Sequence, residues 1–287
     1  MPKRNTHTNK LTNTLISKSK RVNLIKISWE LLKANKILFV PNIVLFLINL
    51  VLFGGFFYLS GIGNTIVNNS YNQFQSITIS FKSLLLLGTY FILTFFVDNY
   101  LLTVKYGMIK DVLLKGKTSF QKGKSFANTH YWTTIGIHIL SSLIVLVPLT
   151  LLALVFFILR PFNLLLSISL FVPIALIYVL YVSIRLIFVY PIMAFEKEGA
   201  YKSIKDGFHF VKTHLHHTIF TWLIVLGLYV FASIFKENLL KVTDFLYQQL
   251  VVLAILFIIL IILIEIAVSV WEHIFIFKSY LIAKKSK

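Results

Sequence analysis

Charged or titratable side chains are few within the long apolar stretches of this 287-residue sequence: Asp98, His138, Arg185, Glu265, Glu272 and His273, of which the first five are the candidate site residues. Charged groups inside a membrane are costly, so they usually face a bundle interior or a water-filled space, where they bind polar groups or relay protons. Two interpretations follow. The residues either line a polar cavity that opens to the cytoplasm, or form ion pairs and hydrogen bonds that hold helices together.

A rise of 1.5 Å per helical residue places four of these side chains near the cytoplasmic ends of their spans. Asp98 lies roughly 10 Å, His138 roughly 12 Å and Glu272 roughly 9 Å from that end by this estimate. Arg185 lies at a similar depth. Glu265 is near the midplane and shares a helical face with Glu272, about two turns later. We therefore expect a shared cavity in which Arg185 is the counter-ion of Asp98 or Glu272.

The composition supports a membrane setting for these groups. Hydrophobic residues make up 57% of the chain and charged residues 13%, with a mean hydropathy of +0.83. Because a soluble domain carries about 25% charged residues, the sequence excludes a cytosolic enzyme and a nucleic-acid-binding module. A membrane-spanning helix needs roughly 20 apolar residues. The runs that qualify are about 37–59, 81–104, 131–158, 164–190, 218–235 and 250–277.

Basic residues are concentrated in alternate connections between these runs. The tail 1–36 carries nine Lys or Arg, 105–130 carries six Lys, 195–217 carries four Lys, and the end from Lys278 carries four Lys. The positive-inside rule then places both termini and two loops in the cytoplasm of a cell-membrane protein. It also explains the net charge of +18 without nucleic acid. Lys outnumbers Arg 24 to 4, which favours an AT-rich bacterial genome.

We predict an all-α bundle of six transmembrane helices that forms a single membrane domain over residues 21–283. Residues 1–20, rich in Thr, Asn, Ser and Lys, are predicted to be a disordered basic cytoplasmic tail, and 284–287 a basic C-terminal tail. The first apolar run begins near residue 37 and is too long for a signal peptide, so we interpret it as a retained span.

Two predicted cytoplasmic helices have apolar and basic sides. Ile25 and Trp29 lie on the apolar side of the first, and Ile204, Phe208 and Val211 on that of the second. Such helices lie in the membrane interface with lysines reaching anionic headgroups; a solvated helical linker is the alternative. The lysines predicted to face the membrane surface are Lys26, Lys33, Lys117, Lys122, Lys124, Lys205 and Lys212.

An internal repeat relates two of the basic loops. At a constant offset of 84 residues, eight pairs between 106–135 and 190–219 are identical. They are Tyr106/Tyr190, Ser119/Ser203, Gly123/Gly207, Phe126/Phe210, Thr129/Thr213, His130/His214, Thr134/Thr218 and Ile135/Ile219. A weaker third copy surrounds residues 25–35. The sequence therefore predicts three units, each an interfacial helix followed by a helical hairpin; convergent loop composition is the alternative.

The other motifs do not indicate catalysis. Gly116-Lys117-Thr118 imitates the end of a phosphate loop, but Asp111 stands where that motif needs glycine. The histidines within 209–217 could bind a transition metal or respond to pH, and a position near acidic headgroups explains them as well. No local spacing of ligands supports a metal site. We predict no enzymatic activity, no cofactor and no bound metal.

A pattern in the fourth span and the following loop matches a known family. It combines an Arg late in a span, an acidic residue before Gly, a short helix and a basic residue before the next span. The residues are Arg185, Glu196 or Glu198, Gly199, Ala200, Ile204, Gly207 and Lys212. The stretch resembles the membrane domain attached to some glycerophosphoryl diester phosphodiesterases and YciC-like inner-membrane proteins. The resemblance implies a six-span fold without phosphodiesterase chemistry, which belongs to a separate soluble domain.

Three functions stay open at this stage. The first is a permease-like, non-enzymatic protein that handles lipid or an amphipathic solute through the cytoplasm-facing cavity. The second is a transporter subunit whose basic loops dock a cytoplasmic ATPase. The third is a structural or immunity-type membrane protein that acts by binding a partner in the membrane. In each case the anionic lipid bilayer is a partner, and nucleic acid is not.

Overall fold

The computed structural model describes residues 23–60, 81–159 and 164–285, and every regular element in these ranges is helical. This confirms the all-α class. The predicted tail 1–20 lies outside the described residues. After a helix over residues 23–34, the elements are η1 (Lys36–Phe39), α2 (Val40–Ser60), α4 (Phe81–Lys115), α5 (Phe120–Leu159), α6 (Leu164–Leu186), α7 (Val189–Glu196), α8 (Ala200–Thr213), α9 (Leu215–Gln249) and α10 (Val251–Lys284).

Six of the described helical segments are long and apolar enough to cross a membrane, as predicted. They are Lys36–Ser60, Phe81–Lys115, Phe120–Ile158, Ile168–Glu196, Leu215–Tyr247 and Val251–Lys284. Several are longer than the predicted spans, because the amphipathic loop segments continue the helices. A bilayer core takes about 20 helical residues, so α4 and α5 must extend beyond it.

Two element boundaries differ from the bounds of the predicted spans. The segment 236–249 was expected to connect two spans, but it belongs to α9, and Leu250 alone separates α9 from α10. Its charges have helical spacing: Lys241 Nζ lies 3.0 Å from the Glu237 carboxylate, an i,i+4 pair that supports a helix. The predicted span 164–190 is divided between α6 and α7. Pro191 lies in the first turn of α7, where its missing N–H costs little.

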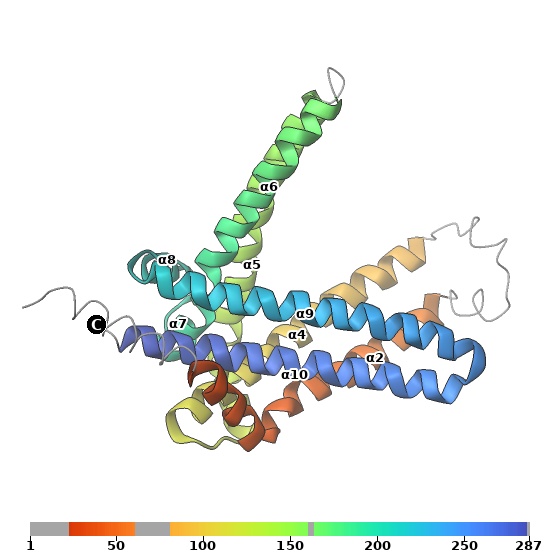
Figure 1. The fold of residues 1–287 in the computed structure, drawn as a ribbon, viewed down its shortest axis with the longest axis horizontal. Coiled ribbons are helices and arrows are strands. Elements are labelled where there is room, and N and C mark those ends of the chain that lie inside the picture. The colour runs from red at the N-terminus through yellow and green to blue at the C-terminus, as the bar shows by residue number, and fades with distance from the viewer. Residues whose placement is uncertain (1–22, 61–80, 160–163, 286–287) are drawn as a thin grey trace, which may run out of the picture.

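The spans form three antiparallel hairpins, α2–α4, α5–α6 and α9–α10, which diverge from a common region (Figure 1). We call this region the hub. It is the buried cluster around Tyr106, Phe188, Met193, Phe275 and Phe277. In each span, at most 17% of the most apolar window is buried. The hairpins are therefore held together at the hub, and most of their apolar surface is left for lipid.

Positions related by the repeat meet one another in the hub. Three contacting pairs are separated by 84 residues: Tyr106 with Tyr190, Lys110 with Ala194, and Glu196 with Tyr280. The rings of the first pair are in tilted contact, with centroids 4.9 Å apart. In the third, the Tyr280 hydroxyl donates to the Glu196 carboxylate at 2.7 Å. This hydrogen bond ties the end of α10 to the end of α7, although neither residue belongs to an identical pair of the repeat.

Two glycines of the repeat play the same packing role. Gly123 in α5 lies against α4, and a Cβ there would come within 2.7 Å of the Val104 carbonyl oxygen and 2.6 Å of Met108 Cγ. Gly207 in α8 lies against α7, where a Cβ would come within 2.9 Å of Val189 Cγ2. Small residues let helices approach closely. The repeat thus places each interfacial helix directly on the preceding helix end.

The repeated histidines have matching contacts as well. The rings of His130 and His214 stack on Phe126 and Phe210, with centroids 4.1 and 4.3 Å apart. In both copies the histidine Nδ1 lies 3.1 Å from the carbonyl oxygen of that phenylalanine. These contacts give the two identical Phe and His positions a structural role.

In the helix over residues 23–34, fewer side chains of the predicted apolar side are buried than the sequence indicates. Leu24, Ser28 and Leu32 are buried, whereas Ile25 is 38% and Trp29 46% exposed. The exposed pair suits contact with the membrane interface, where aromatic rings are favoured. The following η1 contacts both α4 and α10, which brings the first unit of the repeat into the hub.

Candidate functional site

The structure distributes the five predicted cavity residues among four places. Asp98 and His138 are the pair that it brings together, where α2, α4 and α5 meet. Asn49 Nδ2 donates to the Asp98 carboxylate at 3.3 Å, and His138 lies close enough to interact with that charge. The His138 ring also packs edge-on against Phe95, with centroids 5.6 Å apart. These contacts join one hairpin to its neighbour.

Arg185 has partners other than the carboxylates expected from the sequence. Its guanidinium donates to the Phe208 carbonyl oxygen at 3.1 Å. The group also lies over the rings of Tyr181 and Phe208, 5.1 and 5.9 Å from their centroids. Arg185 therefore ties α6 to α8, and the structure gives it no contact with Asp98 or Glu272 among the described interactions.

Glu265 forms an ion pair with Lys236 across the α9–α10 hairpin, and both side chains are about half exposed. Sequence reasoning missed this pair, because it assigned Lys236 to a connection outside the spans. The continuation of α9 through 249 is what places Lys236 opposite Glu265. Both residues, with Tyr229, Ser269 and neighbouring small side chains, line a pocket of about 320 Å³.

Glu272 belongs to a buried polar cluster at the hub end of the same hairpin. It is 8% exposed and accepts a hydrogen bond of 2.6 Å from the Tyr229 hydroxyl. Lys105 is 4% exposed, donates to Ser269 Oγ at 3.3 Å, and interacts electrostatically with Glu272. The sequence assigned Lys105 to the cytoplasmic loop, since the apolar run stops at Val104. This cluster joins α4 to α9 and α10.

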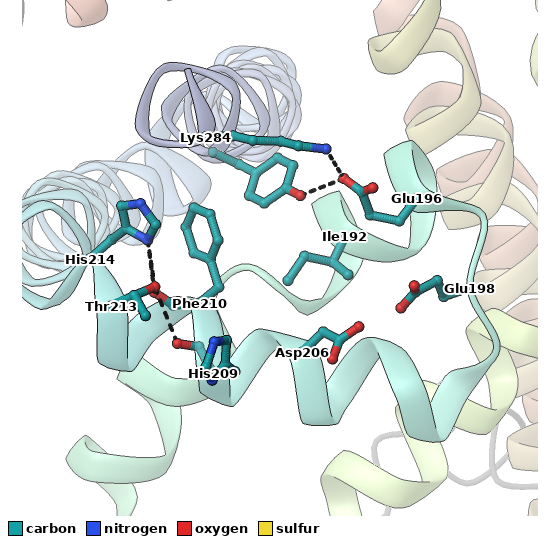
Figure 2. A pocket seen from close by; sticks show the side chains of 10 residues that line it. Ile192, Glu196, Glu198, Asp206, His209, Phe210, Thr213, His214 and Lys284 are labelled. Atoms are coloured by element: carbon teal, nitrogen blue, oxygen red, sulfur yellow. Dashed lines mark hydrogen bonds and ion pairs between the residues drawn. The ribbon is translucent and has the colours of Figure 1, made fainter. Parts of the chain in front are cut away.

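A different, open pocket lies where α7, α8 and α10 meet (Figure 2). We call it the α8 pocket. Its volume is about 330 Å³. The lining residues are Ile192, Glu196, Glu198, Asp206, His209, Phe210, Thr213, His214, Tyr280 and Lys284. The predicted cavity residues are absent from this lining. Glu196 and Glu198 appeared in the sequence analysis as part of the family pattern, without an assigned role.

The turn between α7 and α8 brings two carboxylates to the pocket. Lys197 ends α7 in a left-handed conformation, with φ of 59°, and Gly199 precedes the first turn of α8. This reversal places Glu196 and Glu198 on either side of the turn. Asp206 comes from the middle of α8, about two turns after Glu198. Three acidic residues close in sequence therefore converge from two helices.

The carboxylates of the α8 pocket are unequally neutralised. Glu196 pairs with Lys284 and accepts the hydrogen bond from Tyr280. Glu198 lies 2.7 Å from Lys202, and this hydrogen bond raises the pKa of the Lys202 ammonium group. The second carboxylate oxygen of Glu198 is shielded from solvent and has no hydrogen-bond partner.

Asp206 adds a further charge, since no described basic side chain lies within ion-pair distance of it. Figure 2 shows Asp206 and Glu198 on the same side of the pocket, facing the region between α7 and α8. Phe210, Ile192 and Tyr280 supply apolar and aromatic wall. The pocket thus combines surplus negative charge with an aromatic surface, in a chain whose net charge is +18.

Metal binding is a poor match for this chemistry. Within residues 23–60, 81–159 and 164–285, no three His, Cys, Asp or Glu side chains are grouped so that they could hold a metal ion. An organic cation suits the lining better, because aromatic faces and carboxylates both attract one.

The predicted membrane-surface lysines lie on the outside of the molecule. Lys26, Lys33, Lys117, Lys122, Lys124, Lys205 and Lys212 are all exposed. Two of them form ion pairs, Lys26 with Glu30 at 3.9 Å and Lys122 with Asp111 at 3.4 Å. Their contact with anionic headgroups stays a prediction.

The six spans and the hub define this chain as a multi-pass helical integral membrane protein. Comparison with protein-family models, curated proteins and solved structures finds no match for the chain. Its particular role must therefore be argued from its own pockets.

Proposed function

We propose that this membrane protein binds a cationic amphipathic solute in the α8 pocket and performs no chemistry on it. The observation that supports this proposal is the unpaired charge of Asp206 and the unpartnered second carboxylate oxygen of Glu198, beside the aromatic wall of Phe210 and Tyr280. The volume of about 330 Å³ falls within the usual range of small-molecule sites. The proposal keeps the cytoplasm-facing cavity expected from the sequence, but with different residues.

Each part of the pocket has a separate task in this proposal. Glu198 and Asp206 attract the positive charge of the solute. This attraction is stronger than in bulk water because both carboxylates are partly removed from solvent. Phe210 and Tyr280 cover the apolar part of the solute and add a cation–π contribution. The lysines elsewhere on this side repel free cations, so selectivity requires an apolar body as well as a charge.

Neutralising Asp206 tests the proposal directly. With tetraphenylphosphonium as the probe, we expect Asp206→Asn to weaken binding about fivefold, because a partly exposed charge contact contributes up to about 1 kcal/mol. Isothermal titration of the purified protein in micelles measures the affinity. Glu30→Gln, on the helix over residues 23–34, is the matched control and should bind as the wild type does. Absence of saturable binding, or equal effects of the two variants, would reject the pocket.

The orientation proposed here places both termini and the α8 pocket in the cytoplasm. The chain contains no cysteine, so single cysteines report accessibility without background. We expect a membrane-impermeant maleimide to label Leu250→Cys, at the tip of the α9–α10 hairpin, in intact cells. Lys117→Cys, in the turn between α4 and α5, should be labelled only after the cells have been permeabilised. The reverse pattern would invert the topology.

We also propose kinship with the membrane domains of the phosphodiesterase-associated and YciC-like proteins. Two contacts give the shared pattern a physical reason. Arg185, at the end of α6, donates to the Phe208 carbonyl oxygen in α8, and Gly207 allows α8 to lie on Val189. The packing of α8 against α6 and α7 thus requires an arginine near the end of α6 and a small residue in α8.

A further inference from the structure

A third pocket lies in a groove between α2, α4 and α5. We call it the aromatic groove. Its volume is about 560 Å³, and it opens on the outer surface of the hairpins. The lining residues are Ile48, Phe96, Val97, Tyr100, Leu101, Asn128, Tyr131 and Trp132. Neither the sequence analysis nor the proposed function makes use of it.

The groove is polar at one end and apolar at the other. At the end nearer the hub, the Tyr100 hydroxyl donates to Asn128 Oδ1 at 3.2 Å, so the Asn128 amide nitrogen keeps its capacity to donate. Farther along the span lie the rings of Phe96 and Trp132, and Trp132 is 72% exposed. Because these helices cross the membrane, the polar end faces the headgroup region, and Trp132, one helical turn farther in, lies at the interface where Trp is favoured, beside the start of the acyl chains.

A lysine with no described ion pair stands next to the polar end. Lys124 lies one helical turn before Asn128 in α5, on the same face. It is exposed, and no described carboxylate lies within ion-pair distance of its ammonium group. Lys122, two residues earlier, is engaged instead with Asp111 at 3.4 Å. Lys124 is therefore the cation that this end of the groove can offer to an anion.

We propose that the aromatic groove binds an anionic phospholipid. Its phosphate contacts Lys124 and the Asn128 amide, and an acyl chain lies along Phe96, Trp132 and Ile48. The charge of the lysine and the order of polar and apolar lining select this occupant over a zwitterionic lipid. The site is separate from the α8 pocket, whose ligand has the opposite charge, so either assignment can fail without the other.

Trp132 allows the occupant to be detected in place. The protein is placed in nanodiscs of phosphatidylcholine that contain phosphatidylglycerol with brominated acyl chains, which quench tryptophan fluorescence. The difference in quenching between wild type and Trp132→Phe then reports lipid in the groove. We expect half-maximal quenching at about a fivefold lower fraction of brominated phosphatidylglycerol than of brominated phosphatidylcholine. A factor of about five is the selectivity for anionic lipid that one lysine near a membrane surface contributes. Lys124→Gln should abolish this difference. Lys117→Gln, an exposed lysine in the adjacent turn, should preserve it.

The alternatives give distinct results. Equal quenching by the two lipids in wild type would overturn the proposal, because the groove would then not select an anionic lipid. Equal loss of selectivity in the two lysine variants would overturn it in favour of general surface charge. Native mass spectrometry of the same protein supplies the second measurement. Retention of phosphatidylglycerol by wild type and its loss in Lys124→Gln would support the site. A lipid-free dimer, or displacement of the lipid by excess inorganic phosphate, would overturn it.

Discussion

Replacement of Gly123 by alanine is expected to lower the free energy of unfolding by about 1–3 kcal/mol, the usual cost of overpacking a close helix contact. The added Cβ would lie 2.7 Å from the Val104 carbonyl oxygen and 2.9 Å from Val104 Cγ1. Met108 can move its side chain away, but the Val104 backbone oxygen is fixed by α4. The start of α5 must therefore shift away from α4, which opens the hub.

The repeat supplies a graded series for this experiment. At Gly207, a Cβ would meet the Val189 side chain at 2.9 Å, with backbone atoms no closer than 3.7 Å. Gly207→Ala should therefore destabilise less than Gly123→Ala. Gly227 in α9 has nothing within 4 Å of such a Cβ. Gly227→Ala is the control, and it should be neutral or stabilise by up to about 1 kcal/mol through helix propensity.

Unfolding by sodium dodecyl sulfate in mixed micelles, followed by far-ultraviolet circular dichroism, measures the three variants on one scale. The expected order of stability is Gly227→Ala, then Gly207→Ala, then Gly123→Ala. If Gly123→Ala were as stable as the control, the close approach of α5 to α4 would not contribute to the hub, and the packing role of the repeat would be wrong.

The spans could be predicted because the cost of burying polar groups in lipid is local. Any run of about 20 apolar residues is a candidate span wherever it occurs. Helical continuation past the lipid, as in α4 to Lys115 and α9 to Gln249, was missed. Hydropathy does not detect such extensions, because amphipathic turns stabilised by pairs such as Glu237–Lys241 carry polar residues.

The candidate site was harder to predict, because it depends on which helices meet. Depth estimates put Asp98, Arg185 and Glu272 at one level of the membrane, but the diverging hairpins separate them around the hub (Figure 1). The repeat did contain part of the answer. Its identical pair Tyr106 and Tyr190 meets in the hub, but no identity marked Glu196 and Tyr280, which line the α8 pocket.

The charge distribution gives the two proposed sites a common explanation. The lysines predicted to face the membrane surface are exposed, while Glu196, Glu198 and Asp206 converge on one pocket. A basic surface attracts anionic lipid, and an acidic pocket within it excludes that lipid and accepts a cation. If both proposals hold, the charge distribution keeps the two ligands apart.

The largest electrostatic effect is expected at Lys105 and Glu272, two buried groups that interact electrostatically although the described ion pairs do not include them. Lys105→Met should lower the free energy of unfolding by about 3–5 kcal/mol, since it leaves Glu272 as an uncompensated buried charge. Glu272→Gln should cost a similar amount by stranding Lys105, although glutamine can still accept the hydrogen bond from Tyr229.

The double variant decides whether these two charges act as a pair. Lys105→Met with Glu272→Gln removes both buried charges, so it should be more stable than either single variant, as is found when a buried ion pair is replaced as a unit. Lys26→Met is the control, because Lys26 and Glu30 form an exposed pair with side chains 75% and 60% exposed and should contribute under about 1 kcal/mol. The measurement is the same micelle unfolding, analysed as a double-mutant cycle. Additive losses at Lys105 and Glu272 would mean that each charge is stabilised separately, Lys105 by Ser269 and Glu272 by Tyr229, and that the cluster is not a coupled unit.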